Sequence, residues 1–175
     1  MDRILVALDG STHSDRALDL AADLAEKYQA ELLLVHVAPT APLDESERHM
    51  AAVEYADEIS SWAKDWHEAR SGEQSPNGPE LLLQYGDLAS RFRELVAKRL
   101  MSSAESKLQT RQLRSTESIV QTGDPAKAIL DLAESRGVDA IVIGSRGLGE
   151  ISGLLLGSVS HKVNQLANCI CITVK

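Results

Sequence analysis

Asp9 and a spaced set of glycines are the residues of this sequence whose types and positions could together bind a ligand. Asp9 directly follows the apolar run Ile4–Leu8, and a second apolar run, Val138–Ile143, leads into the motif Gly144-x2-Gly147-x9-Gly157-Ser158. A carboxylate at the end of a strand can accept hydrogen bonds from ribose hydroxyls or from an adenine amino group. Glycines let backbone N–H groups approach phosphate oxygens, and the amino end of a following helix adds a positive dipole. These two features favour a nucleotide as the ligand.

The spacing of the glycines excludes the two most familiar nucleotide loops. The dipeptide Gly-Lys occurs nowhere in the chain, so the phosphate loop G-x4-G-K-[S/T] is absent. Ser152 stands where the dinucleotide fingerprint G-x-G-x2-G, started at Gly147, needs its third glycine. Two alternatives stay open at this point. The glycines could form only a loop between ordered segments, and Arg146 could lie over phosphates or point into solvent.

Five short apolar runs must supply the strands that carry these residues to one place. They are typical of β-strands because they are short and rich in β-branched residues, and helical patterns separate them. The runs cover Ile4–Leu8, Glu31–Val37, Ser118–Gln121, Val138–Ile143 and Cys169–Val174. Nearly continuous apolar strands that alternate with helices favour a parallel sheet covered by helices on both faces.

Start and stop signals place helices between these runs. Asp15–Tyr28 repeats apolar residues at spacings of three and four, with Ser11 and Ser14 as candidate caps. Asp124-Pro125 begins a second helix that stops at Gly137, and a third helix covers about residues 157–166.

The order of the strands predicts which strand ends meet. If the first strand is central and the chain winds outward, returns and winds outward again, the order is 3-2-1-4-5. Ligands of open parallel sheets bind at the carboxyl ends of the strands, where the order reverses. That point lies between the first and fourth strands. Asp9 and the glycine motif are therefore expected to face the same crevice.

Residues 41–111 form an elaborated crossover between the second and third strands. Helical patterns cover about residues 45–70 and 87–109, and the Gly/Pro-bearing segment Ser71–Glu80 separates them. We expect a single domain over residues 1–175, because the length of the chain falls within the usual range for one globular domain.

The composition narrows the classes of function. The net charge is −8, with 43% hydrophobic and 25% charged residues, which is typical of a globular protein and disfavours nucleic acid as a partner. No apolar stretch approaches the length of a membrane span, and the apolar run near the amino terminus is too short for a signal peptide. Cys169 and Cys171 alternate with isoleucines, a spacing that suits neither a disulfide nor a C-x2-C clip. These features predict a cytoplasmic protein with no membrane insertion.

The glycine motif resembles the ATP-binding signature of the universal stress protein family. The likeness covers about residues 1–40 and 113–175, and the section from about Ala41 to Arg111 matches less well. The matching segments are ILVALDGS (4–11), LLLVHV (32–37), GDPAKAI (123–129), VDAIVIGSRG (138–147), LLLGSVSHKV (154–163) and CICITVK (169–175). The resemblance implies a single-domain α/β fold of the adenine-nucleotide-binding, Rossmann-like type, a homodimer through the last strand, and a regulatory role under stress.

The resemblance also implies a set of site residues. By position, Asp9 holds the ribose or adenine side and the backbone of Val37 faces adenine. The residues expected on or near the phosphates are Gly144, Ser145, Arg146, Gly147, Gly157, Ser158, Val159 and Ser160, and the strand ends Ala7, Leu8 and Ile143 complete the site. The expected cofactor is ATP or AMP, with or without Mg²⁺.

Three functions fit these residues. The first is a regulator in which binding of ATP or AMP changes oligomer or partner contacts. The second is a nucleotide-independent adaptor, for example for a transporter, that acts through the crossover. The third is a slow ATPase or self-phosphorylating enzyme using Ser158 or Ser160. Because Asp9 is the one obvious carboxylate near the proposed site and no dedicated base accompanies it, no catalytic or metal-binding residue is predicted.

The exposed edge of the last strand is the basis for the expected partners. A homodimer through Cys169–Val174 would hide an exposed sheet edge, and a tetramer and an unidentified protein partner stay open.

Overall fold

The computed structural model describes residues 1–69, 86–147 and 156–175. The expected break at Ser71–Glu80 lies outside the described residues. Within the described ranges, no helix combines the length and the apolar character that crossing a membrane requires.

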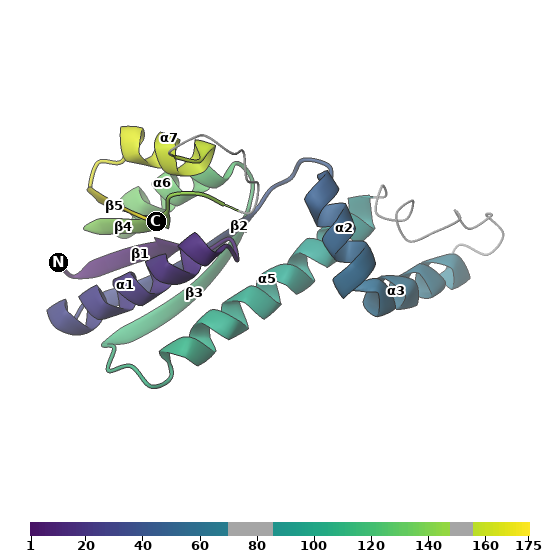
Figure 1. The fold of residues 1–175 in the computed structure, drawn as a ribbon, viewed down its shortest axis with the longest axis horizontal. Helices are drawn as coiled ribbons and strands as arrows, with labels where there is room; N and C mark the ends of the chain where they lie inside the picture. The colour runs from purple at the N-terminus through teal and green to yellow at the C-terminus, as the bar shows by residue number, and fades with distance from the viewer. Residues whose placement is uncertain (70–85, 148–155) are drawn as a thin grey trace. The chain divides into compact units, whose positions relative to one another are not determined.

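Five parallel strands form one sheet in the order β3-β2-β1-β4-β5 (Figure 1). The strands are β1 (Arg3–Ala7), β2 (Glu31–Ala38), β3 (Ser115–Thr122), β4 (Ala140–Gly144) and β5 (Ile170–Val174). Strand β1 is central: Ala7 pairs with Val35 of β2 on one side and with Ile143 of β4 on the other. The carboxyl ends of β1 and β4 are therefore neighbours, as the strand order predicts.

Helices cover both faces of this sheet. Successive residues of β1 point to opposite faces, so Ile4 and Val6 pack in one core while Leu5 and Ala7 pack in the other. The first core is completed by α1 (Thr12–Tyr28) and the later turns of α5 (Gly86–Leu108), and the second by α6 (Pro125–Arg136) and α7 (Ser158–Leu166). The predicted α/β fold, with a five-stranded parallel sheet and helices on both faces, is confirmed.

The remaining helices belong to a second unit of the chain. Backbone contacts divide the chain into residues 1–40 with 97–175, which hold the sheet, and residues 41–96. The second unit contains α2 (Glu45–Glu54), α3 (Ala56–Ala69) and the start of α5. Two helices thus occupy residues 45–69, where the sequence predicts one, and they separate at Tyr55. The Tyr55 ring packs edge-on against Phe92, with centroids 5.3 Å apart, in a core of its own.

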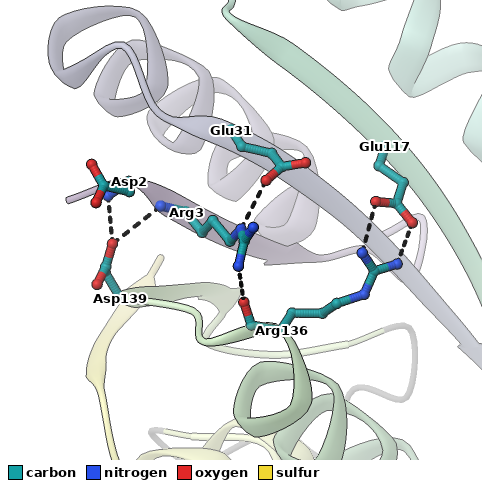
Figure 2. A network of polar contacts seen from close by, with 6 residues as sticks. All are labelled: Asp2, Arg3, Glu31, Glu117, Arg136 and Asp139. Carbon is teal, nitrogen blue, oxygen red and sulfur yellow. Dashed lines mark hydrogen bonds and ion pairs between the residues drawn. The ribbon is translucent and has the colours of Figure 1, made fainter.

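A polar network joins the amino ends of the strands, opposite the carboxyl edge where a ligand is expected (Figure 2). Asp139 accepts hydrogen bonds from the backbone N–H groups of Asp2 and Arg3, and these two bonds hold the pKa of the Asp139 carboxyl below its usual value. The Arg3 guanidinium donates to Glu31 at 2.9 Å and to the Arg136 carbonyl at 2.6 Å. Because one arginine bonds β2 and the end of α6, this edge is fixed by side chains as well as by the sheet.

Candidate functional site

Asp9 lies just beyond β1, in a turn that a glycine makes possible. Gly10 has φ +85°, a conformation that side-chain-bearing residues rarely adopt. The turn brings the N–H of Ser11 within 3.0 Å of Asp9 Oδ1, and this bond fixes the orientation of the carboxylate. The carboxylate is partly exposed at the carboxyl edge of the sheet.

The segment after β4 comes back to this carboxylate. A Cβ built on Gly147 would lie 2.6 Å from Asp9 Oδ2, so the carboxylate occupies the space that a side chain at position 147 would need. Residues that stand far apart in the sequence are therefore in contact here, at the point where the strand order reverses. This is the juxtaposition that the sequence predicts.

Ser11 ties α1 to the same segment. Its hydroxyl accepts the N–H of Ser14 at 3.1 Å, which caps α1, and donates to the carbonyl of Arg146 at 3.2 Å. The sequence indicates Ser11 only as a helix cap. Its place directly after Asp9 and Gly10 is the signal that could have marked it as a site residue.

The start of α7 is anchored to the end of β4. The N–H of Gly157 donates to the Ser145 carbonyl at 2.7 Å, and the Ser160 hydroxyl donates to the same carbonyl at 2.9 Å. Ser145 and Ser160 are 1% and 2% exposed. The Ser160 hydroxyl is thus buried and hydrogen-bonded within the protein, whereas Ser158, at the first position of α7, is exposed.

The three glycines of the motif have different surroundings. A Cβ on Gly144 would lie 2.9 Å from backbone atoms of His13 and Ser14, so this glycine allows β4 to pack against the first turn of α1. A Cβ on Gly157 would meet only ordinary contacts, at 3.5 Å or more, and Gly157 has φ −72°. Among the residues that the structure describes, neither packing nor backbone conformation requires a glycine at position 157.

Apolar strand ends line the sheet beside these groups. Ala7, Val37 and Ile143 share the face on which α6 and α7 pack, and Val159 of α7 contacts the same cluster. Leu8 points to the opposite face. The structure therefore places every predicted site residue at or next to the carboxyl edge of the sheet.

His36 of β2 is a neighbour of the Asp9 turn. Its Nδ1 lies 2.8 Å from the carbonyl oxygen of Leu8, the residue before Asp9. The imidazole therefore helps to fix the backbone that leads into the Asp9 turn.

Charged side chains flank the site. Within the described ranges, the Arg146 guanidinium has no hydrogen-bond or ion-pair partner. Lys162 of α7 makes a long contact, 3.4 Å, with Asp124, which caps α6. The backbone N–H of Lys127 holds the pKa of Asp124 below its usual value, and Lys162 adds to the effect. No group of three or more His, Cys, Asp or Glu side chains in the described part of the chain is placed to hold a metal ion.

Comparison with known proteins identifies the class to which this fold and site belong. The model of the Universal stress protein family matches residues 1–175. The chain therefore belongs to the universal stress protein family.

Relatives and solved structures agree with this assignment. Universal stress protein YxiE of Bacillus subtilis is 32% identical over 177 residues, which cover 99% of both chains. Universal stress protein UspA from Lactobacillus plantarum is 20% identical and superposes with a TM-score of 0.69 over 99% of this chain and 97% of its own.

Two further solved structures contain a nucleotide. One is a universal stress protein in complex with cAMP, with 21% identity and a TM-score of 0.60 over 99% of this chain and 97% of its own. The other is the universal stress protein from Archaeoglobus fulgidus in complex with dAMP, with 21% identity and a TM-score of 0.57 over 100% and 98%. At these identities the likeness demonstrates a shared fold.

Proposed function

We propose that this protein binds an adenine nucleotide, ATP or AMP, at the carboxyl edge of the sheet and acts as a nucleotide-dependent regulator in the stress response. The base and sugar lie near Val37 and Asp9, and the phosphates lie on the first turn of α7. The observation that carries the proposal is the start of α7, where the described residues supply no side-chain cap and do not require the glycine at position 157.

The electrostatics of that helix start suit an anion. The first N–H groups of a helix have no partner within the helix, and at α7 no side chain of the described residues accepts from them. These donors and the helix dipole together favour a phosphate. A glycine at position 157 keeps clear the space that a Cβ would fill, which allows a ligand to approach the backbone closely.

The carboxylate of Asp9 is suited to bind the sugar or the base of such a nucleotide. Oδ1 is held by the Ser11 N–H, so the group is oriented before a ligand arrives. A carboxylate accepts hydrogen bonds only, which matches ribose hydroxyls and the adenine amino group. The solved relatives with cAMP and dAMP support an adenine nucleotide, because both ligands combine adenine, a sugar and one phosphate.

Calorimetric titration tests the proposal. Wild-type protein should bind AMP or ATP with a Kd at or below the millimolar range, and GMP at least tenfold more weakly. Titration of ATP with and without Mg²⁺ tests the metal separately. Gly157→Ala should keep its fold, because a Cβ has room, and should lose at least tenfold in affinity, because that Cβ fills the phosphate site.

A matched pair of variants controls for charge. Asp9→Asn should weaken binding, whereas Asp131→Asn, the same change on the exposed surface of α6, should not. Failure of the wild-type protein to bind any adenine nucleotide at millimolar concentration would sink the proposal.

We further propose that β5 pairs with its copy in a second subunit. Among the described strands β5 pairs only with β4, and Ile170 on it is 56% exposed. An unpaired edge of this kind is a template for association. The N–H of Ile170 and the carbonyl of Val174 bond toward β4, so the N–H of Thr173 points to the open edge. Light scattering should give a dimer for the wild type and a monomer for Thr173→Pro, which removes that N–H; a wild-type monomer would contradict the proposal.

A further inference from the structure

The peptide between Arg146 and Gly147 lies between the starts of two helices. On one side, the Arg146 carbonyl accepts a hydrogen bond from the Ser11 hydroxyl at the start of α1, at 3.2 Å. On the other side, a Cβ on Gly157 at the start of α7 would lie 3.5 Å from the Cα of Arg146. Since α1 and α7 cover opposite faces of the sheet, the peptide separates the two helix starts.

The bonds of Ser11 set the direction of that carbonyl. The Ser11 oxygen accepts the N–H of Ser14, so its one hydrogen is free to donate to Arg146. Ser11 is 7% exposed, and little water can compete for this hydrogen.

The direction of the carbonyl sets the direction of an amide. The described chain contains no cis peptide bond, and a trans peptide points its C=O and its N–H in opposite directions. Because the Arg146 carbonyl points toward α1, the Gly147 N–H of the same peptide points away from α1. It is directed to the side of the sheet on which α7 begins with its uncapped N–H groups.

We infer that Ser11 is a positioning residue that aims the Gly147 N–H at the phosphate of the bound nucleotide. The inference rests on the proposed function, in which Gly147 is already expected at the phosphates, and adds the residue that orients its N–H. Without the Ser11 hydroxyl the peptide is free to turn over, and a carbonyl oxygen would then face the phosphate and repel it. Ser11 thereby discriminates between ligands that carry a phosphate and ligands that do not.

The backbone N–H of Ser11 has a separate task. It holds Asp9, which serves the sugar and base, and a change of the Ser11 side chain leaves it in place. Loss of the hydroxyl should therefore affect phosphate binding and spare nucleoside binding.

Calorimetric titration of AMP and of adenosine tests the inference on Ser11→Ala and Ser11→Gly. Both should bind AMP at least fivefold more weakly than the wild type, while adenosine affinity changes less than twofold. Ser11→Gly is included because glycine is tolerated at helix caps, so one of the two variants should fold. Ser11→Thr, which keeps a hydroxyl, should restore AMP affinity to within twofold.

Ser14→Ala is the matched control. It also removes a buried hydroxyl from the first turn of α1, one that among the described residues bonds only to the Ser11 carbonyl, so the ratio of AMP to adenosine affinity should not change. Equal weakening of AMP and adenosine in the Ser11 variants, or none, overturns the inference while leaving the proposed function intact. Failure of the wild type to bind AMP overturns both.

Discussion

The carboxylate of Asp9 occupies the space beside Gly147 that any side chain at that position would need. A Cβ there would lie 2.6 Å from Asp9 Oδ2. The two residues follow different strands, β1 and β4, which are paired in the sheet. The missing side chain at Gly147 thus leaves room for the Asp9 carboxylate, as well as shaping the course of the segment after β4.

Gly147→Ala should therefore lower nucleotide affinity without unfolding the protein. The atom that must move is the end of the Asp9 side chain, not backbone, so we expect a loss of stability below about 1 kcal/mol. We expect a loss of about tenfold in AMP affinity, which corresponds to about 1.4 kcal/mol. Titration calorimetry and urea unfolding measure the two quantities. Unchanged affinity in a folded variant would show that the position of the Asp9 carboxylate does not matter for binding.

Gly144→Ala should, in contrast, lower the stability of the fold. Its Cβ would lie 2.9 Å from the His13 and Ser14 backbone, which cannot move without shifting α1 away from β4. Overpacking of this kind costs about 1–3 kcal/mol, and we expect the fall in stability in urea unfolding. Gly157→Ala, where the Cβ has room, is the control and should lose less than about 1 kcal/mol. Equal losses at the two positions would contradict the difference in packing.

The sequence predicts the sheet well because its signals there are local. Apolar runs, helix caps and the glycine at position 137 mark the elements. The strand order follows if the chain winds outward from the central first strand, returns to it and winds outward on the other side. The third strand is longer than its apolar core, Ser115–Thr122 against a predicted Ser118–Gln121, because it is an edge strand whose polar residues are mostly exposed. The extent of the domain, residues 1–175, stays a prediction.

The site is predicted less completely because tertiary packing decides its details. The meeting of Asp9 with the glycine motif follows from strand order. The different surroundings of Gly144, Gly147 and Gly157 do not follow from strand order. The spacing alone does not indicate which glycine faces a helix, a carboxylate or open space. The break between α2 and α3 at Tyr55 is also not predicted from the sequence, because no glycine or proline marks it. It coincides with the burial of the Tyr55 ring against Phe92.

Phe92→Ala should destabilise the helices of residues 41–96 and leave nucleotide binding unchanged. Phe92 is fully buried in the core of that unit, and loss of a buried phenylalanine costs about 3–5 kcal/mol. Hydrogen exchange in α2 and α3 should accelerate, and Phe92→Leu should give a smaller effect. All the proposed site residues belong to the other unit, so AMP affinity should stay within twofold. A large loss of affinity would mean that residues 41–96 take part in binding.

Acid should remove the contribution of Asp139 to stability. Backbone N–H groups of Asp2 and Arg3 hold the pKa of this carboxyl below its unfolded value near 3.9. A depressed pKa stabilises the folded state fully above the unfolded pKa, and this stabilisation is lost as the pH falls through the folded pKa. The wild type should therefore exceed Asp139→Asn in unfolding free energy at pH 7. We expect the gap to be below about 1 kcal/mol, because the group is exposed to solvent, and to narrow as the pH falls below the unfolded pKa. Urea unfolding between pH 7 and pH 2.5 measures the gap, with Asp19→Asn on the exposed face of α1 as the control. A gap that persists unchanged at pH 2.5 would show that the charge of Asp139 is not what stabilises the amino edge of the sheet.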